Sequence, residues 1–308
     1  MIQTRRLRTL DIAHATGAAR APFISAASGL VQAGDTLYVV ADDELHIGAF
    51  RAGSRIPGAL IRCFDGELPG PPIARKKAKP DLEALVLLPR FAGFPHGGLL
   101  ALGSGSSAMR ERAALLWLDD AGEAPAAAVA VSFGALYHDL ANHIAPLNIE
   151  GAAVRDDRLC LLQRGHTGAS SALVEIDLAD LLADLAAGCA PRLKRAPAIR
   201  AVALGHLGGV PLHFTDGQVL PDGTLLFSAA AEDTGNAIDD GACRGSAIGA
   251  LGPDGTLRWI APLDTPCKVE GVSATLSGQT LKLLMVTDAD DAGAPAWLLA
   301  GDWPMPAA

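Results

Sequence analysis

Short apolar runs alternate with turn residues along the whole chain, and five of these runs open in the same way. Each opening is a residue with a side-chain oxygen followed by Gly or Ala, and the five are Ser28-Gly29-Leu30, Glu83-Ala84-Leu85, Glu150-Gly151-Ala152, Asp216-Gly217-Gln218 and Glu270-Gly271-Val272. Successive openings are 55, 67, 66 and 54 residues apart, and the step from Glu270 through the C-terminus back to Ser28 is 66. A repeat of this size that closes on itself is typical of a β-propeller.

Each repeat continues as a series of antiparallel strands. In the fourth repeat, Pro221-Asp222-Gly223 separates two apolar runs. This is a hairpin signal, because Pro presets φ and Gly accepts a positive φ. Third strands are predicted at residues 45–50, 113–118, 172–176, 247–251 and 296–300. Outer strands are predicted at residues 59–63, 126–133, 199–204 and 258–262.

The last repeat runs out of chain after its third strand. Residues 3–12 precede the first opening and have no other partner, so we expect them to supply the missing outer strand and close the ring. The prediction is an all-β, five-bladed β-propeller in which residues 1–308 form a single domain. Six blades remain the alternative if one of the 66-residue repeats holds an additional sheet. Helices are predicted at residues 135–141 and 179–187.

Composition excludes several classes of protein. No stretch approaches 18 uninterrupted apolar residues, and the basic N-terminus has no apolar segment behind it, so neither a membrane span nor a signal peptide is expected. The five cysteines are scattered without a CxxC pair, which favours reduced thiols in a cytoplasmic protein. A net charge of −9 without a basic stripe argues against nucleic-acid binding. We expect a monomer, and we interpret the one basic cluster, Arg75-Lys76-Lys77-Ala78-Lys79, as a solvated loop.

The repeat predicts a ring of oxygen atoms around the axis. It places five residues at one depth: Ser28, Glu83, Glu150, Asp216 and Glu270. Carboxylates about 5–8 Å apart in a partly dry channel repel by several kcal/mol at an effective dielectric constant of about 20, so they keep their protons or bind a cation. An all-oxygen ring suits Ca²⁺ better than Mg²⁺. The alternative is that these side chains line a water-filled tunnel or bond backbone amides of neighbouring blades.

Three of the motifs resemble those of the five-bladed calcium-activated nucleotidases (apyrases). The stretches are Ser28-Gly29-Leu30 continued through residues 37–43, Phe214-Thr215-Asp216-Gly217, and Lys268-Val269-Glu270-Gly271-Val272. The resemblance implies a calcium ion on the axis at these positions. Two features depart from that family: Asp216 stands where it has a serine, and no secretory signal is present. The Glu-Gly motifs also resemble phytase-like, esterase-like and gluconolactonase-like propellers, and the whole chain resembles an uncharacterised bacterial propeller family.

The residues that follow each second strand are expected to surround the mouth of the channel. Candidates for binding a substrate are Asp43, Ser104, Ser106, Arg110 and Arg164, and candidates for catalysis are His166, Arg164, Glu232 and Asp288. The loop at residues 103–107 offers amides and hydroxyls to an anion, although a plain Gly/Ser loop is an equal alternative. A histidine near neutral pH can act as an acid or a base, although a loop histidine such as His166 is more often simply exposed.

Together these features predict a calcium-dependent hydrolase. Its substrate would be a small anionic molecule, such as a phosphoanhydride, a phosphoester or a lactone, bound at the mouth above the ion. The rival prediction is a non-enzymatic binding scaffold with a structural axial ion, because no general base stands at a defined spacing.

Overall fold

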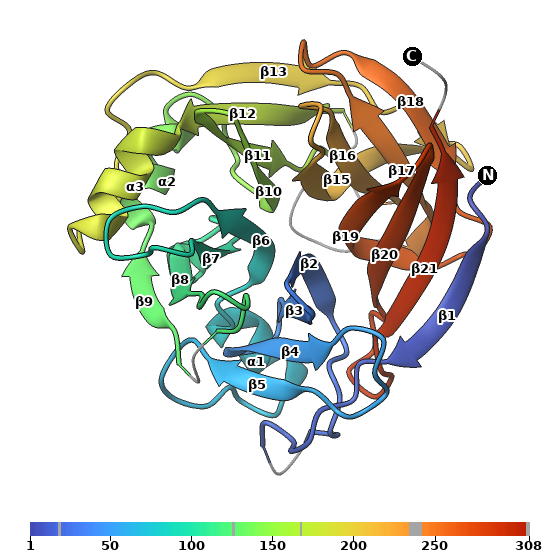
Figure 1. Cartoon of the computed structure of the whole chain (residues 1–308), viewed down its shortest axis with the longest axis horizontal. Helices are drawn as coiled ribbons and strands as arrows, with labels where there is room; N and C mark the ends of the chain where they lie inside the picture. The colour runs from blue at the N-terminus through green and yellow to red at the C-terminus, as the bar shows by residue number, and fades with distance from the viewer. Residues whose placement is uncertain (18–19, 125–126, 167, 234–241, 306–308) are drawn as a thin grey trace.

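Five small sheets surround a central axis and form a five-bladed β-propeller, as predicted (Figure 1). The computed structural model describes residues 1–17, 20–124, 127–166, 168–233 and 242–305. The inner strands are β2 (Ala27–Ala33), β6 (Leu82–Leu88), β10 (Ile149–Arg155), β15 (Val210–Val219) and β19 (Lys268–Ser277). No helix among the described residues is long and apolar enough to cross a membrane.

The remaining strands of each blade follow in antiparallel order from the axis to the outer edge of the ring. The second strands are β3 (Thr36–Ala41), β7 (Gly98–Gly103), β11 (Arg158–Gln163), β16 (Leu225–Asp233) and β20 (Thr280–Asp288). The third strands are β4 (His46–Arg51), β8 (Arg112–Trp117), β12 (Ser171–Asp177), β17 (Ala242–Leu251) and β21 (Trp297–Pro304). The outer strands are β5 (Ala59–Arg62), β9 (Val129–Ser132), β13 (Ala198–Val202) and β18 (Leu257–Pro262), and the fourth blade adds a two-residue strand, β14 (His206–Leu207). The predicted start of the second outer strand, residue 126, lies outside the described residues.

The N-terminal strand closes the ring. Strand β1 (Thr4–Thr9) pairs antiparallel with β21, so the fifth sheet has the order β1-β21-β20-β19. Figure 1 shows the first strand of the chain beside the last. Ile2, Leu10 and Ile12 on either side of β1 are buried. The prediction that residues 3–12 complete the last blade is therefore confirmed.

Each interface between neighbouring blades holds its own apolar core. Leu30 of blade 1 and Leu298 of blade 5 share one cluster, for example, while Leu226 of blade 4 and Leu283 of blade 5 share another. Because both faces of every sheet are covered in this way, burial rather than local propensity stabilises the strands.

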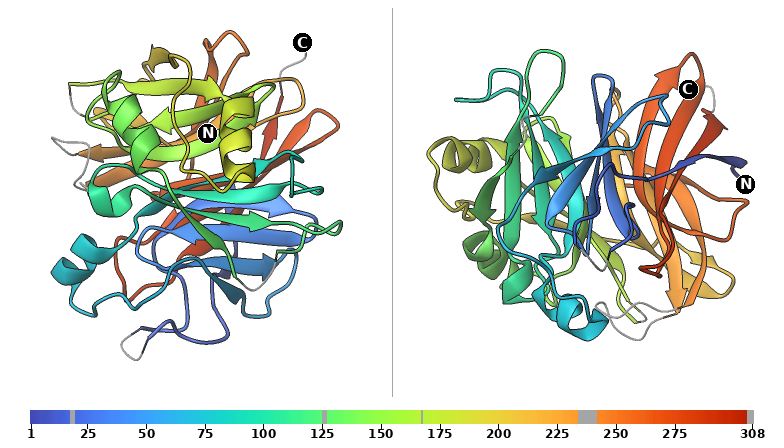
Figure 2. Two further views of the ribbon diagram at one scale, coloured as in Figure 1. Left: turned by 90° about the vertical axis from the view of Figure 1, so that its left-hand side faces the viewer. Right: turned by 90° about the horizontal axis from the view of Figure 1, so that it is seen from below.

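Three α-helices decorate the ring in the described part of the chain, and two of them were predicted. Helices α2 (Gly134–Ala141) and α3 (Leu178–Ala186) lie close to the predicted positions, and Asp177 caps α3 by accepting a bond from Asp180 N at 2.9 Å. The basic cluster, interpreted as a solvated loop, is instead helix α1 (Pro72–Ala78). The Pro71-Pro72 pair begins it, because the fixed φ of proline suits a first helical turn. Figure 2 shows α1 on the face opposite the β2–β3 hairpin turn.

A β-bulge recurs near the start of every inner strand. One residue of the inner strand has no partner on the second strand in each blade, and these five residues are Ser28, Glu83, Glu150, Thr215 and Glu270. A bulge bends the strand and redirects the side chain of the extra residue. The repeated opening in the sequence therefore corresponds to a repeated structural device.

In four of the five blades the residue after the bulge is Gly or Ala, and the inner strands approach one another closely there. A Cβ atom on Gly271 would lie 2.9 Å from Leu30 N, and one on Gly151 would lie 2.8 Å from the Cα of Asp216. Glycine is therefore required for the close approach of successive blades at this level.

Removing the side chain of Leu10 tests the closure. Leu10 packs between blades 5 and 1, so Leu10→Ala should lower the free energy of unfolding by about 2–5 kcal/mol. Deleting residues 1–12 should expose β21 and cause aggregation. Chemical denaturation and the soluble fraction measure the two effects. Ile56→Ala is the control, because Ile56 is 74% exposed and should leave stability unchanged. A deletion variant that remains soluble and melts normally would contradict the closure.

Candidate functional site

Two connected cavities lie at the bulged ends of the inner strands. The larger, which we call the mouth pocket, has a volume of about 580 Å³ and is lined by α1, by loops of blade 1 and by residues 288–292 of blade 5. The smaller, the axial cavity, has a volume of about 30 Å³, enough for one water molecule or ion. Asp42, Lys76, Lys79 and Asp288 line both cavities and mark the passage between them.

Three buried glutamates meet in the axial cavity. Glu83, Glu150 and Glu270 come from the inner strands of blades 2, 3 and 5, and one carboxylate oxygen of each lies within 4.8 Å of the other two. We call this set the glutamate triangle. The bulges bring the three residues to the same depth because each redirects its extra residue towards the axis. These are three of the five residues that the repeat placed in a ring.

The other two predicted ring members are not part of the triangle, although Ser28 is the bulge residue of its blade as the glutamates are of theirs. The hydroxyl of Ser28 donates to the carbonyl of Ala26 at 3.3 Å. Asp216 is one position beyond the bulge of its blade, because Thr215 is the extra residue there. The Thr215 hydroxyl bonds Ser228 Oγ at 2.8 Å and the Val269 carbonyl at 3.0 Å, so it joins blades 4 and 5. The register of the fourth repeat is therefore corrected by one residue.

Asp216 instead closes the channel below the axial cavity. It takes the place that Gly or Ala has in the other blades, and its Oδ2 accepts backbone bonds from Val272 at 2.9 Å and Leu30 at 3.3 Å. Its Oδ1 is buried without a hydrogen-bond partner. Burial raises the pKa of this carboxyl well above its ordinary value, against the smaller opposing effect of the backbone donors. Asp216 thus ties three blades together, which resembles the predicted alternative of bonds to neighbouring backbone amides.

The members of the triangle differ in their partners. Glu150 Oε1 accepts from Asn148 Nδ2 at 2.6 Å and lies 3.4 Å from Arg164 Nη1. Glu270 Oε1 lies 3.1 Å from Lys268 Nζ. Glu83 is only 9% exposed, yet its carboxylate has no hydrogen bond or ion pair with any residue that the structure describes. An ionised carboxylate in such a place is costly unless a cation or a proton joins it.

Lys268 is the centre of a buried ion-pair network. Its Nζ lies 3.1 Å from Glu232 and Glu270, 3.3 Å from Asp290 and 3.4 Å from Asp288. Arg164 extends the network, because it pairs with both Glu150 and Glu232. Two basic side chains thus hold carboxylates of blades 3, 4 and 5 in fixed positions.

A second network lies on the side of blades 1 and 2. Lys79 pairs with Asp42 and, at 2.9 Å, with Asp81. Asp81 also accepts from Ser104 Oγ at 2.6 Å and pairs with Arg110 at 2.8 Å. Oxygens of Asp42, Asp81 and Glu83 also lie within 4.8 Å of one another, so Glu83 stands between this network and the triangle.

Burial and neighbouring carboxylates raise the pKa values of three acidic groups in the site. Burial, together with Asp81 and Glu150, raises the pKa of Glu83 well above its ordinary value. Burial raises the pKa of Glu270 in the same way, and the nearby carboxylates add to the effect of burial while Lys268 opposes it. Burial raises the pKa of Asp42 to about 7 although Lys79 opposes it. Burial and neighbouring carboxylates thus disfavour the charged forms of Glu83 and Glu270.

The predicted rim residues are distributed unevenly around the two cavities. Asp43 lines the mouth pocket, Arg110 and Arg164 line the axial cavity, and Asp288 lines both. Ser104 and Ser106 are not among the described lining residues of either cavity. They form hydrogen bonds with side chains that line the axial cavity, Ser104 with Asp81 and Ser106 with Arg110.

Two of the predicted catalytic residues, Glu232 and His166, do not line either cavity among the described residues. Glu232 is buried beneath Arg164 and Lys268. His166 forms a backbone bridge with Ala169 and is not among the described residues that line either cavity.

The basic cluster also differs from its prediction. Arg75 and Lys79 are nearly buried, with side chains 11% and 12% exposed, because both reach inwards to pair with acids of blade 1. Arg75 Nε donates to the carbonyl of Asp43 at 3.1 Å and lies 3.5 Å from the carboxylate of Asp43. Lys76 is exposed and lines both cavities.

Several site residues were not predicted from the sequence although a signal for them exists. Asp81, Asn148 and Lys268 line the axial cavity and each stands two residues before a glutamate of the triangle. Because strand side chains alternate, residues two apart share a face, so this spacing could have found them. The register at Asp216 also had a signal. In blades 1 and 3 the first turn residue, Gly34 or Asp156, follows the bulge residue by six positions. The first turn residue of blade 4 is Pro221, so the same spacing makes Thr215 the bulge residue.

The glutamate triangle fits a hard cation. Oxygen ligands 2.3–2.6 Å from Ca²⁺ lie at most about 5 Å apart, and one oxygen from each of the three glutamates lies within 4.8 Å of the other two. Among the described lining residues of both cavities, nine carboxylates face seven basic side chains. One divalent cation would supply the positive partner that the Glu83 carboxylate lacks among the described residues.

Comparison with known proteins shows the family. Residues 23–301 match the DUF6929 family, which is described as a family of unknown function, and the chain belongs to it. No curated protein matches the sequence.

Solved structures share the propeller fold at low sequence identity. A protein from Parabacteroides distasonis, described as a candidate glycoside hydrolase, has 9% identity and a TM-score of 0.50, with coverage of 100% of this chain and 98% of that one. A mannose phosphorylase from Leishmania mexicana in complex with phosphate ion has 11% identity and a TM-score of 0.45, with coverage of 99% and 94%. A protein described as a candidate gluconolactonase has 11% identity and a TM-score of 0.44, with coverage of 99% and 94%.

Substitution of Asp216 tests its role in closing the channel. Asp216→Ala should lower the free energy of unfolding by about 2–5 kcal/mol, because two buried N–H groups lose their acceptor. Asp216→Asn keeps an acceptor and imitates the protonated carboxyl, so it should be tolerated. Urea denaturation of the two variants measures the difference, and equal stability of both would contradict the role.

The same carboxyl should make stability depend on pH. Its pKa is raised on folding, so its contribution is complete below the unfolded pKa of about 4 and is lost as pH rises towards the folded pKa. In metal-free buffer, the wild type should lose about 1.4 kcal/mol per pH unit from this group within that window, and Asp216→Asn should lack this loss. The exposed substitution Asp302→Asn is the control, and identical pH profiles for all three proteins would refute the assignment.

Proposed function

We propose that this member of the DUF6929 family is a divalent-cation-dependent hydrolase, with Ca²⁺ as cofactor, that acts on a small anionic substrate at the mouth pocket. The observation that carries the proposal is the state of Glu83. Its carboxylate has no hydrogen bond or ion pair with any described residue, and in the axial cavity one of its oxygens lies within 4.8 Å of oxygens of Glu150 and Glu270. A group with a strongly raised pKa in a cleft is a candidate for function.

Glu83, Glu150 and Glu270 would hold the cation. When bound, such an ion polarises a substrate oxygen and lowers the pKa of attacking water. The chain already holds two of the three ligands in place, since Asn148 and Arg164 fix Glu150 and Lys268 fixes Glu270. Side chains that folding already holds in position need no reorientation when charge develops in the transition state. Such preorganised groups contribute most to catalysis.

The passage between the cavities supports an anionic substrate. Lys76, Lys79, Asp42 and Asp288 line it, and Lys79 pairs with Asp42 there. An ammonium group at this point favours a substrate oxygen that carries negative charge, and the acids favour hydroxyl donors. A pocket of about 580 Å³ accepts a molecule the size of a nucleotide or a sugar lactone. Phosphoanhydrides, phosphoesters and lactones are therefore the substrate classes to test.

A structural role is the second candidate, and one observation favours it. Lys268 lies within 3.4 Å of four carboxylates, so a fixed ammonium group already supplies part of the charge that an ion would bring. In that case the networks join the blades, and the mouth pocket serves only for binding. Turnover is the property that separates the two candidates.

Calcium should stabilise the protein through Glu83. An ion that binds only the native state adds about 4 kcal/mol at 1,000 times its dissociation constant, so millimolar calcium should raise Tm relative to EDTA. Glu83→Gln should abolish most of this rise, because it removes a charged ligand. In EDTA the same variant should be at least as stable as the wild type, because it also removes a buried, unpartnered carboxyl.

Asp302→Asn is the matched control for the calcium measurement. Asp302 is half exposed and pairs with Lys282 far from the triangle, so its variant should keep the full calcium response. Calorimetric titration should give one ion per chain for the wild type. An unchanged Tm in calcium, with no metal in the purified protein, would end the cation proposal.

Hydrolysis should depend on Lys76 but not on its neighbour. A screen of nucleoside di- and triphosphates, phytate, p-nitrophenyl esters and sugar lactones with calcium present should identify turnover. A charge-assisted contact is worth about 1.5–3 kcal/mol, so Lys76→Gln should reduce kcat/KM at least about tenfold. Lys77→Gln is the control, because Lys77 is exposed and lines neither cavity among the described residues.

Arg164→Ala is a poor test of substrate binding. Arg164 is buried between Glu150 and Glu232, so its loss leaves two buried carboxylates unpaired and destabilises the fold. Absence of turnover in every substrate class, together with normal calcium binding, would favour the structural role.

A further inference from the structure

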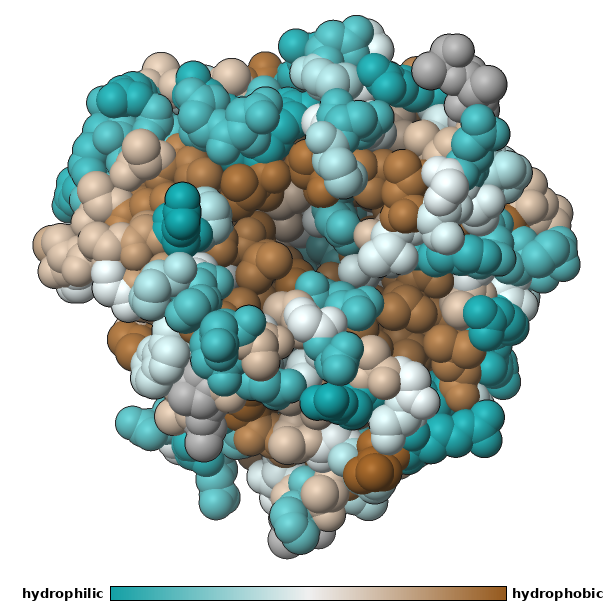
Figure 3. Space-filling model, viewed as in Figure 1, coloured by the Kyte–Doolittle hydropathy of each residue, from teal (hydrophilic) through white to brown (hydrophobic). Residues whose placement is uncertain are grey.

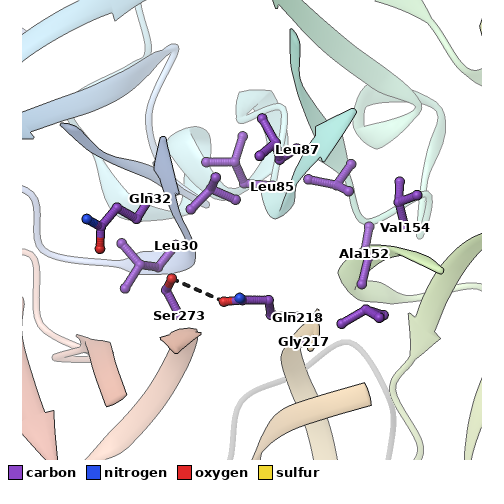
Figure 4. A pocket seen from close by; sticks show the side chains of 13 residues that line it. Leu30, Gln32, Leu85, Leu87, Ala152, Val154, Gly217, Gln218 and Ser273 are labelled. Atoms are coloured by element: carbon purple, nitrogen blue, oxygen red, sulfur yellow. Dashed lines mark hydrogen bonds between the residues drawn. The ribbon is translucent and has the colours of Figure 1, made fainter. Parts of the chain in front are cut away.

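The face opposite the mouth carries an apolar pocket on the same axis. It has a volume of about 200 Å³ and is lined by inner-strand residues of all five blades, among them Leu30, Leu85, Val154 and Val219. Figure 4 shows Leu30, Leu85 and Ala152 around one space, and Figure 3 shows the hollow at the centre of the face with apolar side chains around it. None of its lining residues is ionisable.

A second cavity continues from this axial pocket along blade 5. It has a volume of about 210 Å³, and Gln32 and Ser273 line both spaces. The donors of these two side chains are already engaged, because Gln32 Nε2 donates to Gly34 O at 3.2 Å and Ser273 Oγ donates to Gln218 Oε1 at 3.1 Å. An apolar chain that passes between them therefore breaks no hydrogen bond.

The floor of this second cavity is a row of four residues across the sheet. Ser273, Leu284, Ala300 and Arg5 stand opposite one another on successive strands, so they share one face. Neighbouring strands are about 4.8 Å apart, which makes the row about 14 Å long. It runs from the axis to the outer edge of the blade over two apolar residues.

The outer end of the row carries the charge. Arg5 is exposed and has no hydrogen bond or ion pair with any described residue. The adjacent Lys282 and Asp302 pair with each other at 2.7 Å, so this end of the cavity has one unbalanced positive charge. The whole surface is thus apolar at the axis and cationic at the rim.

We propose that this face binds an amphiphile with an extended apolar chain and one anionic head group, of the kind represented by a medium-chain carboxylate. The chain lies over Leu284 and Ala300 and enters the axial pocket between Gln32 and Ser273, and the carboxylate pairs with Arg5. This site is separate from the proposed hydrolytic site, because Asp216 and the close-packed backbones around it lie between the two.

Titration calorimetry of the whole protein with straight-chain carboxylates tests the proposal. Each methylene group that leaves water should tighten binding about fourfold, so decanoate should bind roughly 200-fold more tightly than hexanoate. Decanol has the same chain without the charge and should bind at least about tenfold more weakly than decanoate. Affinity that does not increase from hexanoate to decanoate would overturn the binding of the chain over Leu284 and Ala300.

Arg5→Gln locates the head group. It should weaken decanoate binding at least about tenfold and leave decanol binding unchanged, because only the charged contact is lost. Arg55→Gln, at an exposed arginine on blade 1, is the matched control and should bind decanoate as the wild type does. Both variants are at exposed positions, and their Tm should equal that of the wild type. No binding of decanoate to the wild type, or equal weakening by both variants, would overturn the proposal.

Discussion

The close approach of five backbones at the axis is the constraint on which the rest of the structure depends. Successive inner strands touch at the residue after each bulge, where Gly29, Gly151 and Gly271 leave no room for a Cβ atom. At the same level Asp216 supplies a carboxyl group that bonds the backbones of blades 1 and 5. Because the strands meet so closely, the bulge residue just before this level projects towards the mouth. The glutamate triangle is therefore a consequence of how the ring closes.

This constriction also separates two chemically different halves of the axis. On the side of the mouth, acids and bases of all five blades are arranged in networks around Lys268 and Lys79. On the other side, the same inner strands present leucine and valine to a pocket without an ionisable lining residue. A single set of strands can do both, because the bulge changes which side chains face the axis at each end. We infer two binding sites of opposite character on one ring.

Much of this architecture follows from the sequence. The recurrence of an oxygen-bearing residue before Gly or Ala predicted five blades, and the shortage of one strand after residue 300 predicted closure by β1. The repeat also predicted that Glu83, Glu150 and Glu270 would meet. It misplaced the fourth member because Thr215 and Asp216 both carry oxygen, and only the spacing to the turn at Pro221 distinguishes them.

The charge networks could not be predicted in the same way. Arg75 and Lys79 lie in a cluster that is typical of a solvated surface, and they are nearly buried only because Asp42, Asp43 and Asp81 from other segments reach them. Such pairing depends on tertiary distances that no local pattern encodes.

Anomalous X-ray diffraction from crystals grown with Tb³⁺ in place of Ca²⁺ tests the central claim most directly. The account predicts one strong peak bounded by the carboxylates of Glu83, Glu150 and Glu270, with Lys268 still paired to Glu232. A map without a peak at the axis, in crystals where the three carboxyl groups bond only one another or water, would contradict it.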